Sequence, residues 1–317
     1  MEVKMNNPFF RNGQRPLVIA HRGDCTNAPE NTMAAFQAAL DAGSDGIELD
    51  VFLTSDNHVI VFHDEDTERL TGDKGDITEM TLDQVRQLSV DGEPIPTLEE
   101  VLTEFAEKLL INVELKAFRP KWDRRHTGTE AAKIIRKCGV SERVVVTSFD
   151  PFMLWYLERE FPGLQSGFAY DDDMAIDLDA WFEKLSQQDI IDDVVRFVSR
   201  FEQISEGISS AVNWLTGWFT GERFITFITE MNAIGRLIDS TVVDVEHTLI
   251  DNDTIQKFHE KHMAVGAYTF FSTDPGYVNK LDEAEQIKRI HELTDMKVDW
   301  IETDNPGKVK KILDSTP

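Results

Sequence analysis

The sequence has little of three things: cysteine, long apolar runs and positive charge. Its 317 residues include only two cysteines, Cys25 and Cys138, which excludes a fold built on a disulfide framework. No apolar run could span a bilayer and residues 1–15 carry no apolar signal segment, so we expect a cytoplasmic protein. Lysine and arginine number 32 against 58 acidic residues, a net charge of −26. That deficit argues against nucleic acid and against electrostatic docking on anionic lipid.

What the chain does have is enough apolar material for a large core, arranged in alternating strand and helix patterns. Its length fits one large α/β barrel with additions or two small domains, and its hydrophobic content of 41% can supply a substantial core. Short β-branched runs indicate buried strands, and stretches with helical spacing, among them residues 275–293, separate them. The expected strands are residues 17–20, 46–51, 109–116, 144–147, 164–169, 242–245, 265–269 and 300–302. We therefore expect a (β/α)8 barrel that makes residues 1–317 one catalytic domain.

Two histidines and a pair of carboxylates stand at the ends of expected strands. His21 and His63 each follow a short apolar run, which is where a parallel barrel carries its active site. Residues 45–51 alternate with the strand period of two, so Glu48 and Asp50 point to the same side. Two carboxylates on a buried face are costly unless a cation lies between them, which indicates a cation site.

Several motifs together resemble those of the glycerophosphodiester phosphodiesterase family. They are His21-Arg22-Gly23, Pro29-Glu30-Asn31-Thr32, Glu48-Leu49-Asp50-Val51, His63-Asp64, Glu114-Leu115-Lys116, Ser148-Phe149 and, more loosely, Thr303-Asp304-Asn305-Pro306. The resemblance covers most of the chain, with a gap over residues 171–235. It implies a TIM barrel and a metal-dependent hydrolase that converts glycerophosphodiesters to glycerol 3-phosphate and an alcohol.

Three carboxylates are the expected metal ligands. Glu48, Asp50 and Glu114 come from the ends of two strands, and carboxylate oxygens suit a hard divalent cation, Mg²⁺ or Ca²⁺. Zinc would favour nitrogen and sulfur ligands. The alternative is a set of exposed charges at strand ends, but the two histidines at matching strand ends favour a metal site.

The expected acid–base pair is His21 and His63. Cleavage of a phosphodiester needs one group to take a proton from the attacking oxygen and another to protonate the leaving alkoxide, and histidine can do either. Both histidines also match the catalytic positions of the family that the chain resembles. We favour His21 as base and His63 as acid, although the residues leave the order open. Arg22 and Lys116 are the expected phosphate-binding cations, the first as a fork and the second as a point charge.

Two insertions are expected in the barrel. The polar residues 64–95 resemble the small insertion that the family carries over the barrel mouth. Residues 171–238 are expected to form amphipathic helices with an aromatic stripe. Residues 171–235 hold 13 acidic residues against 4 basic ones, whereas interfacial membrane helices are usually basic. We therefore favour a lid or a homo-oligomer contact, with transient contact to neutral lipid as the alternative.

The chain departs from the family pattern at two positions, and other functions compete with the favoured one. Tyr268 stands near the place of a family tryptophan and is expected to form an aromatic wall for the glycerol or the leaving alcohol. Trp300 stands where the family tends to have glycine.

The first alternative function is a lysophospholipase D-type hydrolase of lysophospholipids that uses the aromatic insertion. The second is a barrel that binds phosphodiesters without catalysis.

Overall fold

A computed structural model describes residues 7–116, 126–171, 240–275, 277 and 280–315. Contacts divide the chain into two compact units, Met1–Ala169 with Ile238–Pro317 and Tyr170–Leu237. The first unit holds the elements discussed below, apart from the last residue of one strand. The helical insertion expected over residues 171–238 lies outside the described residues, except for Asp171.

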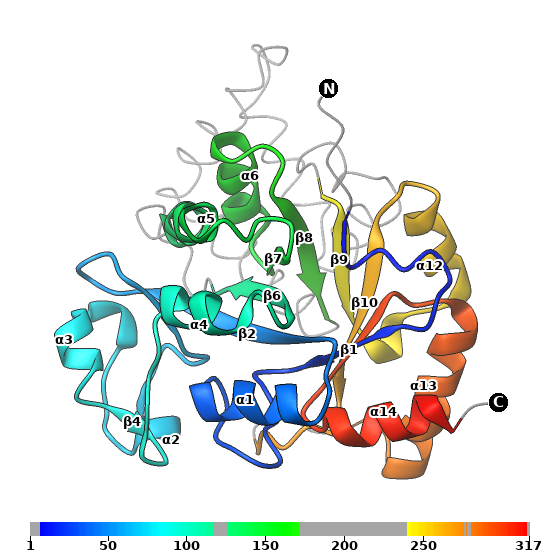
Figure 1. The fold of residues 1–317 in the computed structure, drawn as a ribbon, viewed down its shortest axis with the longest axis horizontal. Coiled ribbons are helices and arrows are strands. Elements are labelled where there is room, and N and C mark those ends of the chain that lie inside the picture. The colour runs from blue at the N-terminus through cyan, green and yellow to red at the C-terminus, as the bar shows by residue number, and fades with distance from the viewer. Residues whose placement is uncertain (1–6, 117–125, 172–239, 276, 278–279, 316–317) are drawn as a thin grey trace, which may run out of the picture. The chain divides into compact units, whose positions relative to one another are not determined.

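The first unit is a closed barrel of parallel strands with helices around it (Figure 1). The main sheet of the described residues has nine strands, of which only β3 (Val59–Val61) runs antiparallel, and the pairing of β1 with both β2 and β11 closes it. The parallel strands are β1 (Leu17–Ala20), β2 (Gly46–Leu53), β6 (Leu110–Leu115), β7 (Val144–Ser148), β8 (Gln165–Tyr170), β9 (Val242–Glu246), β10 (Ala264–Phe270) and β11 (Trp300–Thr303). The expected (β/α)8 barrel is confirmed.

Helices follow most of the barrel strands, and side chains cap the start of several of them. The helices are α1 (Met33–Asp41), α4 (Leu98–Phe105), α5 (His126–Cys138), α6 (Pro151–Glu160), α12 (Asn252–His259), α13 (Glu283–Met296) and α14 (Pro306–Asp314). Thr97 and Glu100 cap each other's backbone at the start of α4, as Asp282 and Glu285 do at α13. This second capping box explains why α13 begins at Glu283 and not at residue 275 as the spacing predicted. Among the described helices, none is both long and apolar enough to cross a bilayer.

The stretch after β3 forms short elements that pack on β2 and β3. They are α2 (Glu68–Thr71), a 3₁₀ turn (Ile77–Glu79), α3 (Leu82–Val85), β4 (Ser89–Val90) and β5 (Glu93–Pro94). Ile77 and Val85 share a buried apolar cluster with Phe52 of β2 and Ile60 of β3. This packing gives residues 64–95 a small core of their own beside the barrel strands, so that α2 can present side chains to the site.

The amino-terminal end of the barrel is filled by apolar side chains. Leu17, Leu110 and Val242, each the first residue of its strand, join the ring of Trp300 in one buried cluster. Trp300 fits because its neighbour in register on β10 is Gly266: a Cβ there would lie 2.0 Å from the indole ring. The tryptophan that departs from the family pattern is therefore matched by a glycine on the next strand.

Candidate active site

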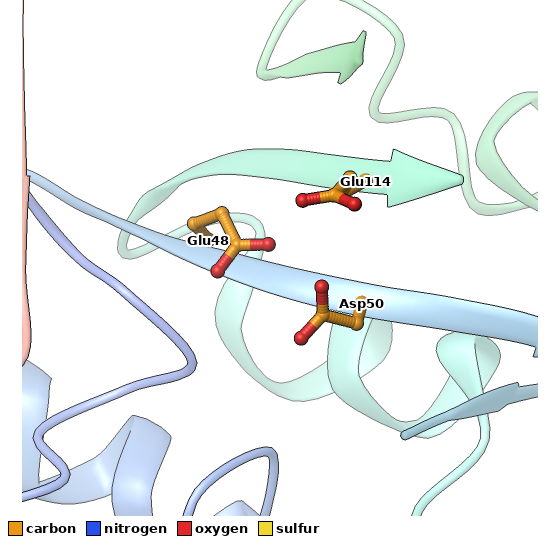
Figure 2. Close-up of side chains that lie close together, drawn as sticks. All are labelled: Glu48, Asp50 and Glu114. Carbon is orange, nitrogen blue, oxygen red and sulfur yellow. The ribbon is translucent and has the colours of Figure 1, made fainter. Parts of the chain in front are cut away.

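Three carboxylates converge at the carboxyl ends of β2 and β6. Asp50 and Glu114 are partners in the register of these strands, and Glu48 lies two residues before Asp50 on the same face. One oxygen from each of the three lies within 4.8 Å of the others, and Figure 2 shows the side chains turned toward one another. Ile47 and Leu49 point the other way into the core, as the strand period predicted.

The three carboxylates fit a divalent cation. Glu48 and Asp50 are almost fully buried, and Oε1 of Glu48 has no hydrogen-bond partner. Burial, together with the charges of Asp50, Glu302 and Glu114, raises the pKa of Glu48 well above its usual range. Burial also raises the pKa of Glu114. A cation among these oxygens would supply the missing partner and offset the cost of burying three negative charges.

Two basic side chains border the carboxylates. Lys116 Nζ lies 2.6 Å from Glu114 Oε1 and 2.9 Å from Asp50 Oδ1. Burial would lower the pKa of Lys116, but these two carboxylates raise it, so the ammonium stays charged. Nε of Arg22 lies 3.4 Å from Asp50 Oδ2, and the side chain of Arg22 is only 9% exposed. Both predicted phosphate-binding residues therefore lie against the carboxylates, and both are positively charged.

The loop after β1 is fastened to the carboxylates by backbone geometry. Arg22 has a positive φ of 57°, and its backbone N–H donates to Glu48 Oε2 at 3.0 Å. Gly23 follows with φ of 91°, and a Cβ there would lie 2.6 Å from that of Ala35. Asn31, also at positive φ, donates to Asp50 Oδ2 at 2.8 Å. The His-Arg-Gly and Pro-Glu-Asn-Thr motifs thus orient the two carboxylates of β2.

Each of the two histidines is held by a carboxylate. His21 Nδ1 lies 2.7 Å from Asp304 Oδ1, and His63 Nδ1 lies 2.6 Å from Asp64 Oδ1. A carboxylate acceptor at Nδ1 favours the tautomer with its proton there, which leaves Nε2 free to exchange a proton with a substrate. Burial, with the charges of Lys116 and Arg22, lowers the pKa of His63 to about 4.

A chain of ion pairs surrounds Arg22 and reaches the inserted helix α2. Arg22 Nη1 lies 3.0 Å from Glu30 Oε1 and 3.1 Å from Asp274 Oδ2. Arg69 of α2 pairs with both Glu30 and Asp64. Burial alone would raise the pKa of Asp64, but the hydrogen bonds from His63 and Arg69 hold it well below the usual range.

A second polar layer lies inside the barrel on neighbouring strands. The amide of Asn112 donates to Glu302 Oε1 at 2.9 Å and to Asp244 Oδ2 at 3.3 Å, and accepts from Thr147. Trp300 Nε1 donates to the same oxygen of Glu302 at 3.0 Å. Burial raises the pKa of both Asp244 and Glu302. These hydrogen bonds tie the polar layer to the apolar filling of the barrel.

Tyr268 ends up at the carboxyl end of β10. Its ring meets Phe149, which follows β7, edge-on with centroids 6.1 Å apart. The two aromatic rings therefore come from strands that are not adjacent in the barrel, and they form a pair at its carboxyl end.

The predicted site residues thus fall into a three-carboxylate cluster with Lys116 and Arg22 against it, two histidine–carboxylate pairs and an aromatic pair. Sequence reasoning assigned no role to Asp304, Asp64, Glu30, Asn31, Asp244, Glu302, Arg69 and Asp274. The first four stand inside the quoted motifs. Asp244 and Glu302 carry the signal that marked β2, an acid at alternate positions of an apolar strand. Arg69, on the short helix α2, and Asp274, in a loop, carried no local signal.

Comparison with known proteins identifies relatives. The model of the glycerophosphoryl diester phosphodiesterase family matches residues 21–308. A glycerophosphodiester phosphodiesterase of Caldanaerobacter subterraneus is 40% identical over 167 residues, which are 49% of this chain and 67% of the relative. Glycerophosphodiester phosphodiesterase 1 of Homo sapiens is 36% identical over 129 residues, 38% of each chain.

Solved structures share the fold. A glycerophosphoryl diester phosphodiesterase from Silicibacter pomeroyi, itself an assignment by similarity, superposes with a TM-score of 0.67 at 20% identity over 96% of this chain and 97% of its own. A phosphodiesterase from Oleispira antarctica, solved with its product sn-glycerol-3-phosphate, superposes with a TM-score of 0.64 at 21% identity over 95% and 98%.

Proposed function

The chain belongs to the glycerophosphoryl diester phosphodiesterase family, and we propose that it hydrolyses glycerophosphodiesters to glycerol 3-phosphate and an alcohol with a divalent cation. One observation carries the proposal. The carboxylate cluster lies at the carboxyl ends of the barrel strands, where this fold does its chemistry. The basic side chains of Arg22 and Lys116 and the two histidines held by carboxylates lie at the same end.

Glu48, Asp50 and Glu114 would hold the cation, and their all-oxygen set suits Mg²⁺ or Ca²⁺. When bound, the cation would neutralise charge on the phosphoryl oxygens. Lys116 pairs with Glu114 and Asp50, and with a cation bound these carboxylates would share their negative charge between Lys116 and the cation. Lys116 and Arg22 would then bind the anionic phosphate, with Arg22 able to fork onto two oxygens.

His21 and His63 would move the protons. His21, with Nδ1 directed at Asp304, would present Nε2 as a base toward water or the neighbouring glycerol hydroxyl. His63 would protonate the leaving alkoxide. Its pKa of about 4 leaves it neutral at pH 7 before substrate binds. The anionic diester would offset the charges of Lys116 and Arg22 that contribute to this low value, so we expect substrate binding to raise the pKa of His63.

Other parts of the chain have proposed roles around this chemistry. Tyr268 with Phe149 would line the glycerol or leaving-alcohol side of the site. Residues 64–95 would border the mouth, and residues 171–238 would form a lid or a homo-oligomer contact within one catalytic domain. The substrate would be a small-molecule phosphodiester.

The test is an assay of glycerophosphocholine hydrolysis beside lysophosphatidylcholine, with Mg²⁺, with Ca²⁺ and with chelator. We expect release of glycerol 3-phosphate from glycerophosphocholine, supported by one of the cations and lost with chelator. Turnover of lysophosphatidylcholine alone would replace the proposal by the lysophospholipase D-type function. If neither these substrates nor glycerophosphoethanolamine, glycerophosphoglycerol and glycerophosphoinositol turn over with either cation, the enzymatic proposal is rejected in favour of a binding barrel.

A further inference from the structure

Arg69 lies outside the barrel strands, on α2 of the insertion, yet it contacts two carboxylates of the site. Its Nη1 and Nη2 donate to Glu30 Oε2 and Oε1 at 3.1 and 2.9 Å. Its Nη2 also donates to Asp64 Oδ1 at 3.0 Å, and its Nε donates to Asp64 Oδ2. One guanidinium therefore forks onto two carboxylates at once, which is geometry that a lysine cannot provide.

The two carboxylates are shared in the same way. Asp64 Oδ1 serves both Arg69 and His63 Nδ1, while Oδ2 is bound by Arg69. Glu30 Oε1 serves both Arg69 and Arg22 Nη1, while Oε2 is bound by Arg69. Arg69 binds both oxygens of each carboxylate and so fixes its plane, which directs the shared oxygen at the site residue, His63 or Arg22.

Burial alone does not hold these carboxylates in place. The side chains of Asp64 and Glu30 are 21% and 13% exposed, so each could turn toward water if its second partner were lost. A freed Asp64 would no longer fix the ring and the Nδ1–H tautomer of His63. A freed Glu30 would leave Arg22 to its contacts with Asp50 and Asp274.

We infer that Arg69 is a positioning residue that orients His63 through Asp64 and Arg22 through Glu30, and so couples the acid–base and phosphate-binding halves of the site. The inference rests on the proposed function for its meaning in catalysis. It assigns the insertion a mechanical part in the site, since α2 supplies the shared partner.

The test compares Arg69→Gln with wild type, Arg69→Lys and Arg86→Gln. Arg86 is the matched control: it is 32% exposed against 30% for Arg69, belongs to the same insertion and forks onto Glu100 of α4, away from the site. We expect R69Q to lower kcat for glycerophosphocholine about 10–100-fold. R69K should recover less than half of that loss on a logarithmic scale, and R86Q should stay within about twofold of wild type.

Three further measurements separate positioning from a general loss of structure. In an Asp64→Asn background, R69Q should lower kcat by a clearly smaller factor than it does in wild type, because the route through Asp64 is already cut and only the route through Glu30 remains. The imidazole ¹⁵N shifts of His63, which report its tautomer, should move in R69Q and stay in R86Q. Binding of inorganic phosphate by calorimetry should weaken several-fold in R69Q.

Wild-type kcat in R69Q, losses that multiply in the double variant, or unchanged His63 shifts would each overturn the inference. Failure of the proposed function looks different, because wild type itself would then turn over no diester. The ¹⁵N shifts and phosphate binding need no turnover, so they decide the role of Arg69 in that case as well.

Discussion

The two histidines have the same partner chemistry but different electrostatic surroundings. Each directs Nδ1 to an aspartate, Asp304 for His21 and Asp64 for His63. His63 also lies in the field of Lys116 and Arg22, which adds to burial in lowering its pKa to about 4. When an anion pairs with Lys116 and Arg22, their lowering effect on the pKa of His63 should weaken and the pKa should rise. This behaviour suits an acid that is charged only in the substrate complex.

Replacement of His63 by Ala should therefore lower kcat more for substrates whose leaving groups are more basic. For the choline ester of glycerol phosphate we expect a loss of about 10²–10⁴-fold in kcat, because the alkoxide leaves unprotonated. For the 4-nitrophenyl ester, whose leaving group needs no proton, the loss should stay below about tenfold. Steady-state kinetics with both esters make the comparison.

His21→Ala is the paired variant, since a missing base should slow both esters alike. If H21A instead shows the dependence on the leaving group and H63A slows both, then the two roles are exchanged.

At the scale of elements, β10 and β11 depend on each other through one glycine. A Cβ on Gly266 would lie 2.0 Å from the ring of Trp300, far inside any normal contact, and both residues are enclosed by the apolar cluster at the amino-terminal end of the barrel. Such overpacking forces the backbone or the ring to move.

Gly266→Ala should destabilise the fold by about 3 kcal/mol or more, seen as a fall of several degrees in the calorimetric Tm. Gly307→Ala is the control, because a Cβ there meets only Ala42 at 3.9 Å and alanine favours the helix. Replacing the indole ring by the smaller leucine side chain in G266A/W300L should recover part of the lost stability. An unchanged Tm in G266A would contradict this account of the packing.

Most strands were predictable from sequence because they are short runs rich in β-branched residues whose ends meet polar residues, although β8 has no β-branched residue. All the expected barrel strands appear within two residues at each end. Residues 275–282 were predicted helical from polar spacing alone, but the capping box at Asp282 starts α13 later. The carboxylate cluster followed from period-two alternation on β2. Arg69 and Asp274 could not be predicted, because only the closed barrel brings α2 to Glu30 and the loop of Asp274 to Arg22.

At the scale of the whole molecule, the net charge of −26 opposes the binding of any anionic substrate at long range. Attraction must therefore come from local cations at short range. The buried carboxylates Glu48, Asp50 and Glu114 make that local balance depend on a divalent ion, whose binding to the folded state alone should stabilise it.

Addition of Mg²⁺ or Ca²⁺ should raise Tm, and by linkage a concentration of 100 times Kd contributes about 2.7 kcal/mol. Sodium chloride at equal ionic strength controls for screening of the net charge. Glu114→Gln should lose most of the divalent effect, while Glu104→Gln, an exposed acid on α4, should keep it. Equal shifts in E114Q and wild type would contradict a specific site.

The apolar filling around Trp300 gives the barrel a closed floor, with Phe9 from the amino-terminal segment set edge-on against the indole ring, 5.4 Å between centroids. Within the described residues, a substrate would therefore reach the polar side chains from the carboxyl ends of the strands. Under the proposed function, substrate and products would share this route past α2, so a product still bound at Arg22 and Lys116 would block the next molecule. Under the same proposal the alcohol, with no contact to Arg22 or Lys116, would leave first, and glycerol 3-phosphate would leave last and compete directly with incoming diester.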